Sequence, residues 1–330
     1  GCASTCVEYR TATTAARSEK NLKRAEEWAL KALESPECSP ATDAYAPYFL
    51  ATEIYLQQKK FTKMAEMLNI AEQRNPDQPL ENPFKQGNTP VTTIGEGIEA
   101  YREQEWIKIY NKAVDYIQND KIDKAEEQIE IAILINSKKR ENYSTLAAIY
   151  LENGDMVAAL DIINRGLESD YTNSILHHFK GDISSRNNDL KAAEISYKKA
   201  IEHSNDPGPI MKNLLFVYID MGNNQRAINY SNDLLDKYPN DPDLYYNVGV
   251  LYQRLTLETF DPARELFLST TDESSPEIIQ KVYDSFVTAR KYAYNSKDYF
   301  LQASDLELDE NLSTREAVSE MEKLMDQIDE

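Results

Sequence analysis

A repeat with a period of 34 residues constrains the fold of this chain more than any other feature of its sequence. Tyrosines recur on one 34-residue grid, and alanines recur on a second grid at a constant offset from the first. The grid positions are Tyr116, Tyr150, Tyr218 and Tyr252 for the first set and Ala125, Ala159, Ala193 and Ala227 for the second. Apolar residues between them recur at spacings of three and four, as on one face of a helix. The sequence therefore predicts repeated helical units, which must stack because no single helix pair buries both of its apolar faces.

Single segments of the repeat match a known pattern. Residues 245–252 read Tyr-Tyr-Asn-Val-Gly-Val-Leu-Tyr, and residues 211–218 begin another nearly complete unit. In these segments the chain resembles the tetratricopeptide repeat, a helix-turn-helix unit with aromatic, Leu-Gly, Tyr and Ala positions. His177 and Lys180 depart from the pattern where an aromatic residue and Leu are expected. The resemblance implies an all-α fold: a right-handed TPR superhelix (α-solenoid) of about seven repeats with a C-terminal capping helix.

The grid also divides the chain into units and insertions. The repeats are predicted near 6–39, 45–78, 106–139, 140–173, 174–207, 208–241 and 242–311, in a single superhelix over 6–330 that follows a linker at 1–5. Residues 79–105 are rich in Pro and Gly, which predicts an insertion loop leading into a helix that begins near Ile98. A second insertion is predicted at 256–296, because Pro262 and the polar run 269–275 interrupt the last unit and displace its second helix to 299–303; a helical stretch is predicted within the insertion over 277–296. The capping helix is predicted over 313–329, behind a capping box.

Composition limits the classes of function. The formal net charge is −20, whereas binding to nucleic-acid phosphate or to an anionic membrane surface requires a basic surface. The sequence contains no phosphate-binding Gly-rich loop, nucleophile elbow or His-Glu-x-x-His motif. His177 and His178 are adjacent on a predicted helix, so their side chains point about 100° apart and do not readily share a metal. We therefore expect a non-catalytic protein with no cofactor, no metal and no nucleic-acid partner.

The cysteines suggest a compartment. The dipeptide Gly1-Cys2 resembles the end of a bacterial lipoprotein signal, in which the cysteine receives the lipid; the alternative is a cloning remnant. With Cys2 lipidated and the membrane reached only through that anchor, Cys6 and Cys38 remain as an even pair, as in an oxidising compartment. Antiparallel pairing in the first unit brings Cys6 near Cys38, which predicts a disulfide; the alternative is two unpaired thiols.

The resemblance also implies a binding surface, a concave groove lined by the first helix of each unit. The groove-facing positions of the family that we select as candidate binding residues are Phe49, Tyr110, Asn111, His178, Lys212, Asn213, Phe216, Tyr246 and Asn247. The asparagines can hold an extended peptide backbone, because an amide both donates and accepts hydrogen bonds. The Lys, Arg and Asn cluster with which chaperone-binding relatives grip a carboxylate is not reproduced, so aromatic or aliphatic anchors are the expected ligand groups. Alternatively, the asparagines are ordinary polar helix residues and the aromatic residues pack between helices.

These observations favour a non-catalytic adaptor or assembly scaffold that binds a peptide or partner helix, lipid-anchored on the periplasmic side of a bacterial envelope. One alternative is a solute-binding lipoprotein for a sugar or peptide nutrient, whose pocket is built by the two insertions. Another is a cytoplasmic scaffold without a lipid. Residues 301–330 hold ten acidic and two basic side chains, so a basic partner at the C-terminus is also expected, against the alternative of a solvated capping surface.

Overall fold

The computed structural model describes residues 6–271, 273–306 and 312–330 of the chain, and Cys2 lies outside the described residues. Contacts within it divide the chain into two compact units, Gly1–Leu176 and His177–Glu330, where the sequence predicted one continuous array. The division falls inside helix α9 (Ser174–Arg186). It lies beside His177 and Lys180, the residues at which α9 departs from the repeat pattern. Each unit is described below by itself.

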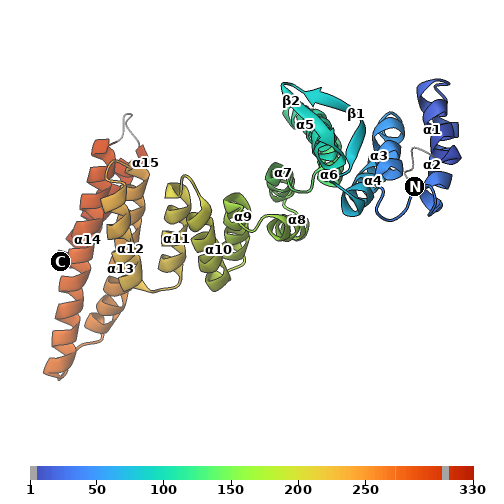
Figure 1. Cartoon of the computed structure of the whole chain (residues 1–330). Helices are drawn as coiled ribbons and strands as arrows, with labels where there is room; N and C mark the ends of the chain where they lie inside the picture. The colour runs from blue at the N-terminus through green and yellow to red at the C-terminus, as the bar shows by residue number, and fades with distance from the viewer. Residues whose placement is uncertain (1–5, 272, 307–311) are drawn as a thin grey trace. The chain divides into compact units, whose positions relative to one another are not determined.

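Both units are built from antiparallel helical hairpins (Figure 1). The first unit contains α1 (Val7–Arg17), α2 (Leu22–Glu34), α3 (Tyr45–Phe49), the π-helix η2 (Leu50–Tyr55), α4 (Phe61–Arg74), β1 (Pro79–Gln86), β2 (Thr89–Thr93), α5 (Ile94–Gln118), α6 (Ile122–Ile135), α7 (Arg140–Glu152) and α8 (Met156–Ser169). The second contains α10 (Leu190–His203), α11 (Gly208–Asp220), α12 (Asn224–Lys237), α13 (Pro242–Leu268), α14 (Pro276–Leu306) and α15 (Leu312–Asp329), together with most of α9. The predicted all-α solenoid class is confirmed.

The turns between paired helices repeat with the same period as the sequence. Asp120, Gly154, Asn188 and Gly222 are 34 residues apart, and all four have a positive φ. This left-handed conformation favours Gly, Asn and Asp, because a larger side chain clashes with its own backbone. In the hairpin α7–α8 the next residue, Asp155, accepts a hydrogen bond from the Ala158 N–H at 2.9 Å and caps α8. Local sequence therefore ends one helix and starts the next at a fixed place in the repeat.

Close packing inside the hairpins explains the small residues on the grid. A Cβ atom at Gly181 would lie 2.5 Å from the ring of Tyr197, and one at Gly249 would lie 2.6 Å from the ring of Phe300. Phe300 thus takes the place in the last repeat that Tyr197 takes two repeats earlier. The segment around 299–303 is part of the second helix of the last unit, although it lies far along the chain from α13.

The prediction of an insertion loop over 79–105 is wrong. Residues 79–93 form an antiparallel hairpin, in which Gln86 pairs with Thr89 across a two-residue turn, and Gly87 adopts φ +60°. Helix α5 begins at Ile94 rather than near Ile98, because Thr93 and Glu96 form a capping box. Pro79, Pro83 and Pro90 led to the prediction of a loop, but proline also occurs at the exposed edges of sheets, as it does here.

The insertion predicted at 256–296 is also corrected. Helix α13 continues through Pro262 to Leu268, and α14 is one helix from Pro276 to Leu306, so the extra residues lengthen both helices of one hairpin. A proline inside a helix costs about 3 kcal/mol. Contacts on both sides of Pro262 offset that cost: Phe260 and Ala263 are buried, and the rings of Phe260 and Phe286 lie 5.8 Å apart.

Helix α15 covers the end of the second unit. Met321 and Ala317 of α15 join a buried cluster with Ala293 and Phe300 of α14. The Arg290 Nε donates to Asp329 Oδ1 at 2.6 Å and ties the end of α15 to α14. Among the described helices, none is both long and apolar enough to cross a membrane.

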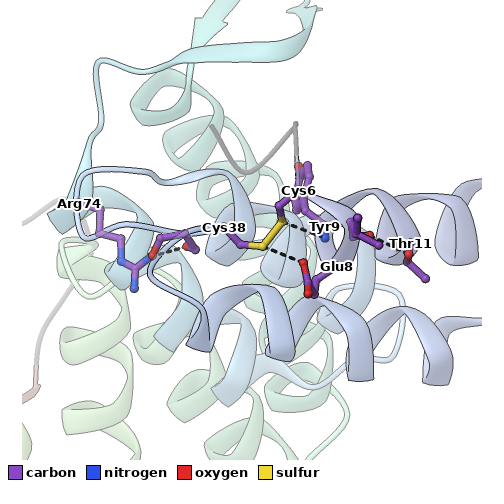
Figure 2. The surroundings of a disulfide bond; sticks show 8 residues. Cys6, Glu8, Tyr9, Thr11, Cys38 and Arg74 are labelled. Carbon is purple, nitrogen blue, oxygen red and sulfur yellow. Dashed lines mark hydrogen bonds between the residues drawn. A yellow bond between two sulfur atoms is a disulfide. The ribbon is translucent and has the colours of Figure 1, made fainter. Parts of the chain in front are cut away.

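A disulfide between Cys6 and Cys38 joins the two ends of the α1–α2 hairpin (Figure 2). Their Cα atoms lie 5.4 Å apart, and Oε2 of Glu8 approaches the Cys38 Sγ to 3.0 Å. These three side chains are close enough to hold a metal ion. The sulfurs in a disulfide lack the thiolate charge that a zinc site uses, so the geometry describes a cross-link rather than a metal centre.

Candidate binding site

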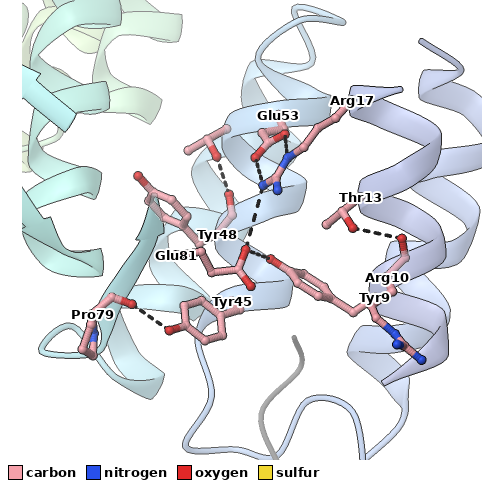
Figure 3. Close-up of polar contacts among 10 residues, drawn as sticks. Tyr9, Arg10, Thr13, Arg17, Tyr45, Tyr48, Glu53, Pro79 and Glu81 are labelled. Carbon is pink, nitrogen blue, oxygen red and sulfur yellow. Dashed lines mark hydrogen bonds and ion pairs between the residues drawn. The ribbon is translucent and has the colours of Figure 1, made fainter. Parts of the chain in front are cut away.

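A pocket of about 270 Å³ lies on the face that the first helices of the first unit share (Figure 3). Three successive first helices, α1, α3–η2 and α5, form its walls together with strand β1. The lining residues are Tyr9, Arg17, Tyr45, Tyr48, Phe49, Thr52, Glu53, Leu80, Glu81, Asn82, Phe84, Ile94 and Tyr101. This is the face on which the family resemblance placed the binding groove, and the hairpin closes one side of it.

Three charged side chains meet at the pocket. The Arg17 guanidinium donates two hydrogen bonds to the Glu53 carboxylate, with N–O distances of 2.9 and 2.5 Å. Glu81 comes from β1, and it accepts a hydrogen bond from the Tyr9 hydroxyl at 2.9 Å. The separation between Arg17 Nη2 and Glu81 Oε2 is longer, 3.9 Å. Arg17 is thus committed to Glu53, while Glu81 keeps more of its charge for another partner.

Six of the ten uncharged lining residues are aromatic. The rings of Tyr48 and Tyr101 meet edge to face with centroids 6.2 Å apart, and Phe84 lies 6.0 Å from Tyr101. Phe49 contacts Tyr9 edge to face at 5.6 Å, and the Arg17 guanidinium lies 5.7 Å from the Phe49 ring centre. The negative faces of such rings attract cations.

Three phenols of the pocket, those of Tyr9, Tyr48 and Tyr101, have raised pKa values. Burial is the main reason that the pKa of Tyr9 is far above its ordinary value, and the charge of Glu81 adds to the effect. Burial likewise raises the pKa of Tyr48 and of Tyr101, with further contributions from neighbouring groups that include Glu53 in both cases. The three hydroxyls therefore stay protonated and can donate hydrogen bonds, and the carboxylates give the pocket a negative potential.

Local structure brings these groups together from distant parts of the sequence. The Tyr45 hydroxyl donates to the Pro79 carbonyl at 2.8 Å and fixes the start of β1 against α3. A Cβ atom at Gly97 would collide with the Tyr48 hydroxyl, so only glycine at this place in α5 lets Tyr48 reach its position. Helix α3 continues directly into η2, and π-helical turns are frequent at functional sites.

Sequence analysis selected Phe49 on this face, and the structure places it in the pocket wall, 2% exposed. It missed Arg17 and Glu81 as a pair, because they approach each other only when the hairpin folds back. The sequence did contain a sign of a binding site there, since the aromatic residue Phe84 and the acidic residue Glu81 lie inside a Pro-rich insertion. The sequence analysis treated that insertion as a connecting loop.

The other groove candidates of the first unit lie on α5. Tyr110 is half-buried; its ring stacks on Trp106 at 5.1 Å, and its hydroxyl is 2.7 Å from Thr145 Oγ1. Asn111, beside it, is exposed. Tyr110 therefore packs between neighbouring first helices, the alternative left open for the aromatic residues.

In the second unit, several candidates pair with groups of the same unit. His178 and Asn213 are brought together, with 2.9 Å between Nε2 and Nδ2. The Lys212 ammonium lies 3.0 Å from Asp241, so its charge is largely neutralised within the chain. Phe216 is 38% exposed and remains accessible.

Tyr246 was selected as an anchor for a ligand, and its side chain is half-buried. Its ring lies 5.3 Å from that of Phe300, and it packs against the cluster that includes Met321 of α15. Part of this side chain therefore packs within the second unit, and its role as an anchor stays a prediction. Asn247, the next residue, is half-buried on the same helix.

A second, larger cavity of about 580 Å³ lies at the far end of the α13–α14 hairpin. Phe267, Leu268, Tyr283 and Val287 line it, and each of these side chains is more than half exposed. Sequence analysis missed this apolar surface because it treated 256–296 as an insertion that interrupts the helices.

Comparisons with known proteins agree on the repeat. A family model described as "Tetratricopeptide repeat" matches residues 176–206. The photosystem I assembly protein Ycf3 of Synechococcus sp. (strain CC9605) is 27% identical over 104 residues, which are 30% of this chain and 57% of the relative. The chain thus spans little more than half the length of that relative.

Solved structures of similar proteins include the C-terminal part of a TPR repeat-containing protein from Cytophaga hutchinsonii. It has a TM-score of 0.46 at 10% identity, covering 94% of this chain and 99% of that one. A tetratricopeptide repeat protein from Parabacteroides merdae has a TM-score of 0.38 at 13% identity, covering 96% of this chain and 98% of that one.

Proposed function

We propose that this chain, which carries tetratricopeptide repeats, is a non-catalytic adaptor that binds a segment of a partner protein on the first-helix face of its first unit. The observation that carries the proposal is the pocket lined by α1, α3–η2, α5 and β1. Strand β1 illustrates the mode of binding. Its extended backbone already lies against this face, where Tyr45 donates to the Pro79 carbonyl and Tyr9 donates to Glu81. A partner segment can use the same kinds of contact.

The size of the pocket favours a protein partner over a free solute. Pockets for small molecules usually measure about 300–1,000 Å³, and this one, at about 270 Å³, is smaller. A single side chain of a peptide fits within such a volume, while the rest of the peptide lies outside. The name of the Ycf3 relative, an assembly protein, also supports a role as an assembly scaffold.

A lipid on Cys2 and a periplasmic location are part of the proposal. The disulfide between Cys6 and Cys38 supports an oxidising compartment, because cytosolic thiols are kept reduced. The proposal also includes a basic partner at the acidic C-terminus, but ion pairs within the chain reduce the negative charge there. Glu322 pairs with Lys297 and Asp329 pairs with Arg290, which leaves less negative charge for an outside partner.

Site-specific photo-crosslinking in the source cells tests the adaptor function. The full chain carries p-benzoylphenylalanine in place of Phe84, at the pocket, or in place of Tyr171, an exposed aromatic residue of the same unit that does not line the pocket. We expect a defined protein to crosslink at 84 and not at 171. In an unmodified background, Phe84→Asp should abolish its recovery and Tyr171→Asp should not. Equal crosslinking at both positions, or none at 84, contradicts the proposal.

A solute-binding lipoprotein remains a second candidate, because the β1–β2 hairpin closes one side of the pocket as a solute site would require. Isothermal titration of the full chain with monosaccharides and dipeptides tests it. Saturable binding of a monosaccharide that Phe84→Ala removes and Tyr171→Ala leaves intact favours this candidate over the adaptor, whereas binding of dipeptides alone is compatible with both.

A further inference from the structure

We propose that the pocket of the first unit recognises a cationic side chain, a lysine or arginine, on the segment that it binds. This inference rests on the proposed function, since it names the chemistry of the ligand at the same site. It starts from the charges that line the pocket. They are one positive charge, on Arg17, and two negative charges, on Glu53 and Glu81, which leaves a formal charge of −1.

The pairing among these three side chains decides whether the pocket favours a cationic or an anionic ligand. Arg17 already forms a two-point contact with Glu53, the strongest geometry for this pair of groups. An anionic ligand would have to displace Glu53 from Arg17. A cationic ligand has only to approach Glu81, which is 3.9 Å from Arg17 and 22% exposed. A cation therefore competes only with the long Arg17–Glu81 ion pair and leaves the two-point contact between Arg17 and Glu53 in place.

The aromatic walls favour the same ligand. Tyr48, Phe84 and Tyr101 form a corner of rings with centroid separations near 6 Å, and Phe84 is 36% exposed. Such a corner contacts the methylene stem of a lysine or arginine and attracts its charged end. Arg17 illustrates the mode within the chain, because its guanidinium combines a carboxylate partner with the face of Phe49.

Burial and the nearby carboxylates raise the pKa values of Tyr9, Tyr48 and Tyr101, as described above. Burial is the larger cause and disfavours a charge of either sign. The smaller contributions, from Glu81 on Tyr9 and from Glu53 on all three phenols, show a negative potential in the pocket, which favours a cation. The geometry and the electrostatics of the pocket thus point in one direction.

Nuclear magnetic resonance of the full chain with labelled tyrosine rings tests the inference. The probes are the Nα-acetyl methylamides of lysine and arginine, with norleucine as the uncharged analogue and glutamate as the anion. We expect the lysine and arginine probes to shift the signals of Tyr48 and Tyr101 saturably. The norleucine and glutamate probes should shift them at least about fivefold less at the same concentration.

A pair of matched variants sharpens the test. Glu81→Gln removes the charge but keeps an oxygen that accepts from Tyr9, so the fold should be retained; the amide spectrum checks this. We expect it to weaken lysine binding about fivefold, as loss of one partly exposed ion pair does. Glu66→Gln, an exposed glutamate outside the pocket, should leave the binding unchanged.

Either of two results overturns the inference: equal shifts by norleucine and lysine, or stronger binding of glutamate. If a partner crosslinks at position 84 while the cationic probes show no preference, the adaptor function stands and only the cation specificity fails. If the cationic probes bind but no partner protein crosslinks at position 84, the cation specificity stands and the adaptor function fails.

Discussion

Reduction of the Cys6–Cys38 disulfide should loosen the α1–α2 hairpin by an amount that the structure allows us to work out. The cross-link closes a loop of 32 residues. The chain-entropy relation gives a loss of about 12.4 cal/mol/K for a loop of that length, or about 3.7 kcal/mol at 25 °C. On reduction the Cys38 thiol can donate to Glu8, whose carboxylate lies 3.0 Å away, and so recovers about 1.5 kcal/mol. The expected net destabilisation of the hairpin therefore lies between about 2 and 4 kcal/mol.

Hydrogen exchange of the full chain, oxidised and then reduced, measures this effect. Amides of α1 and α2 should exchange about 30- to 700-fold faster after reduction, because each 1.4 kcal/mol changes an equilibrium constant tenfold. Amides of α12, in the other unit, serve as the control and should change less than about twofold. A mass gain of about 2 Da on reduction first establishes that the bond was present. Two free thiols before reduction, or an acceleration in α1 and α2 below about fivefold, would refute the reasoning.

Three further outcomes follow from the packing and the caps. In urea unfolding, Phe300→Ala should cost about 3–5 kcal/mol because the side chain is fully buried, while Leu268→Ser, at a side chain 73% exposed, should stay within about 0.5 kcal/mol. Asp155→Ala should cost about 1 kcal/mol through loss of the α8 cap in the same assay, and Asp155→Asn should cost little. Backbone N–H groups of the two threonines before Glu96 hold the pKa of this carboxyl below its usual range. The contribution of Glu96 to stability is therefore complete above its unfolded pKa and is lost as the pH falls through the lower folded pKa. A carboxyl ¹³C titration measures that folded pKa.

The hairpins from α7 to α12 could be predicted from the sequence because their determinants are local. A residue tolerant of positive φ, a capping Asp or Asn and an apolar stripe recur every 34 residues, and each acts on its own turn of chain. Tyr197 and Phe300 extend the same rule to the second helices, where each ring fills the space left by a glycine. The period therefore predicts the scaffold in detail wherever the repeat is regular.

The β1–β2 hairpin and the continuous α13 could not be predicted in the same way, because tertiary contacts override local preference there. Strand β1 is exposed along most of its length, so its sequence shows no alternation of apolar and polar residues. It is fixed instead by contacts such as the one between Tyr9 and Glu81, which are 72 residues apart. Pro262 indicates a helix end locally, yet burial of Phe260 and Ala263 against α14 keeps α13 continuous.

The binding site follows from this difference between regular and irregular parts. The alanines on the 34-residue grid are committed to the core: Ala125, Ala159, Ala193 and Ala227 are fully buried. They stabilise the stack and offer little surface to a ligand. The pocket arises where the repeat is interrupted, since β1 brings Glu81 and Phe84 onto a face that the first helices alone would leave open. A variant that replaces residues 79–91 with a short Gly-Ser linker, and so keeps Thr93 as the cap of α5, should therefore keep the helical hairpins and lose the preference for cationic side chains.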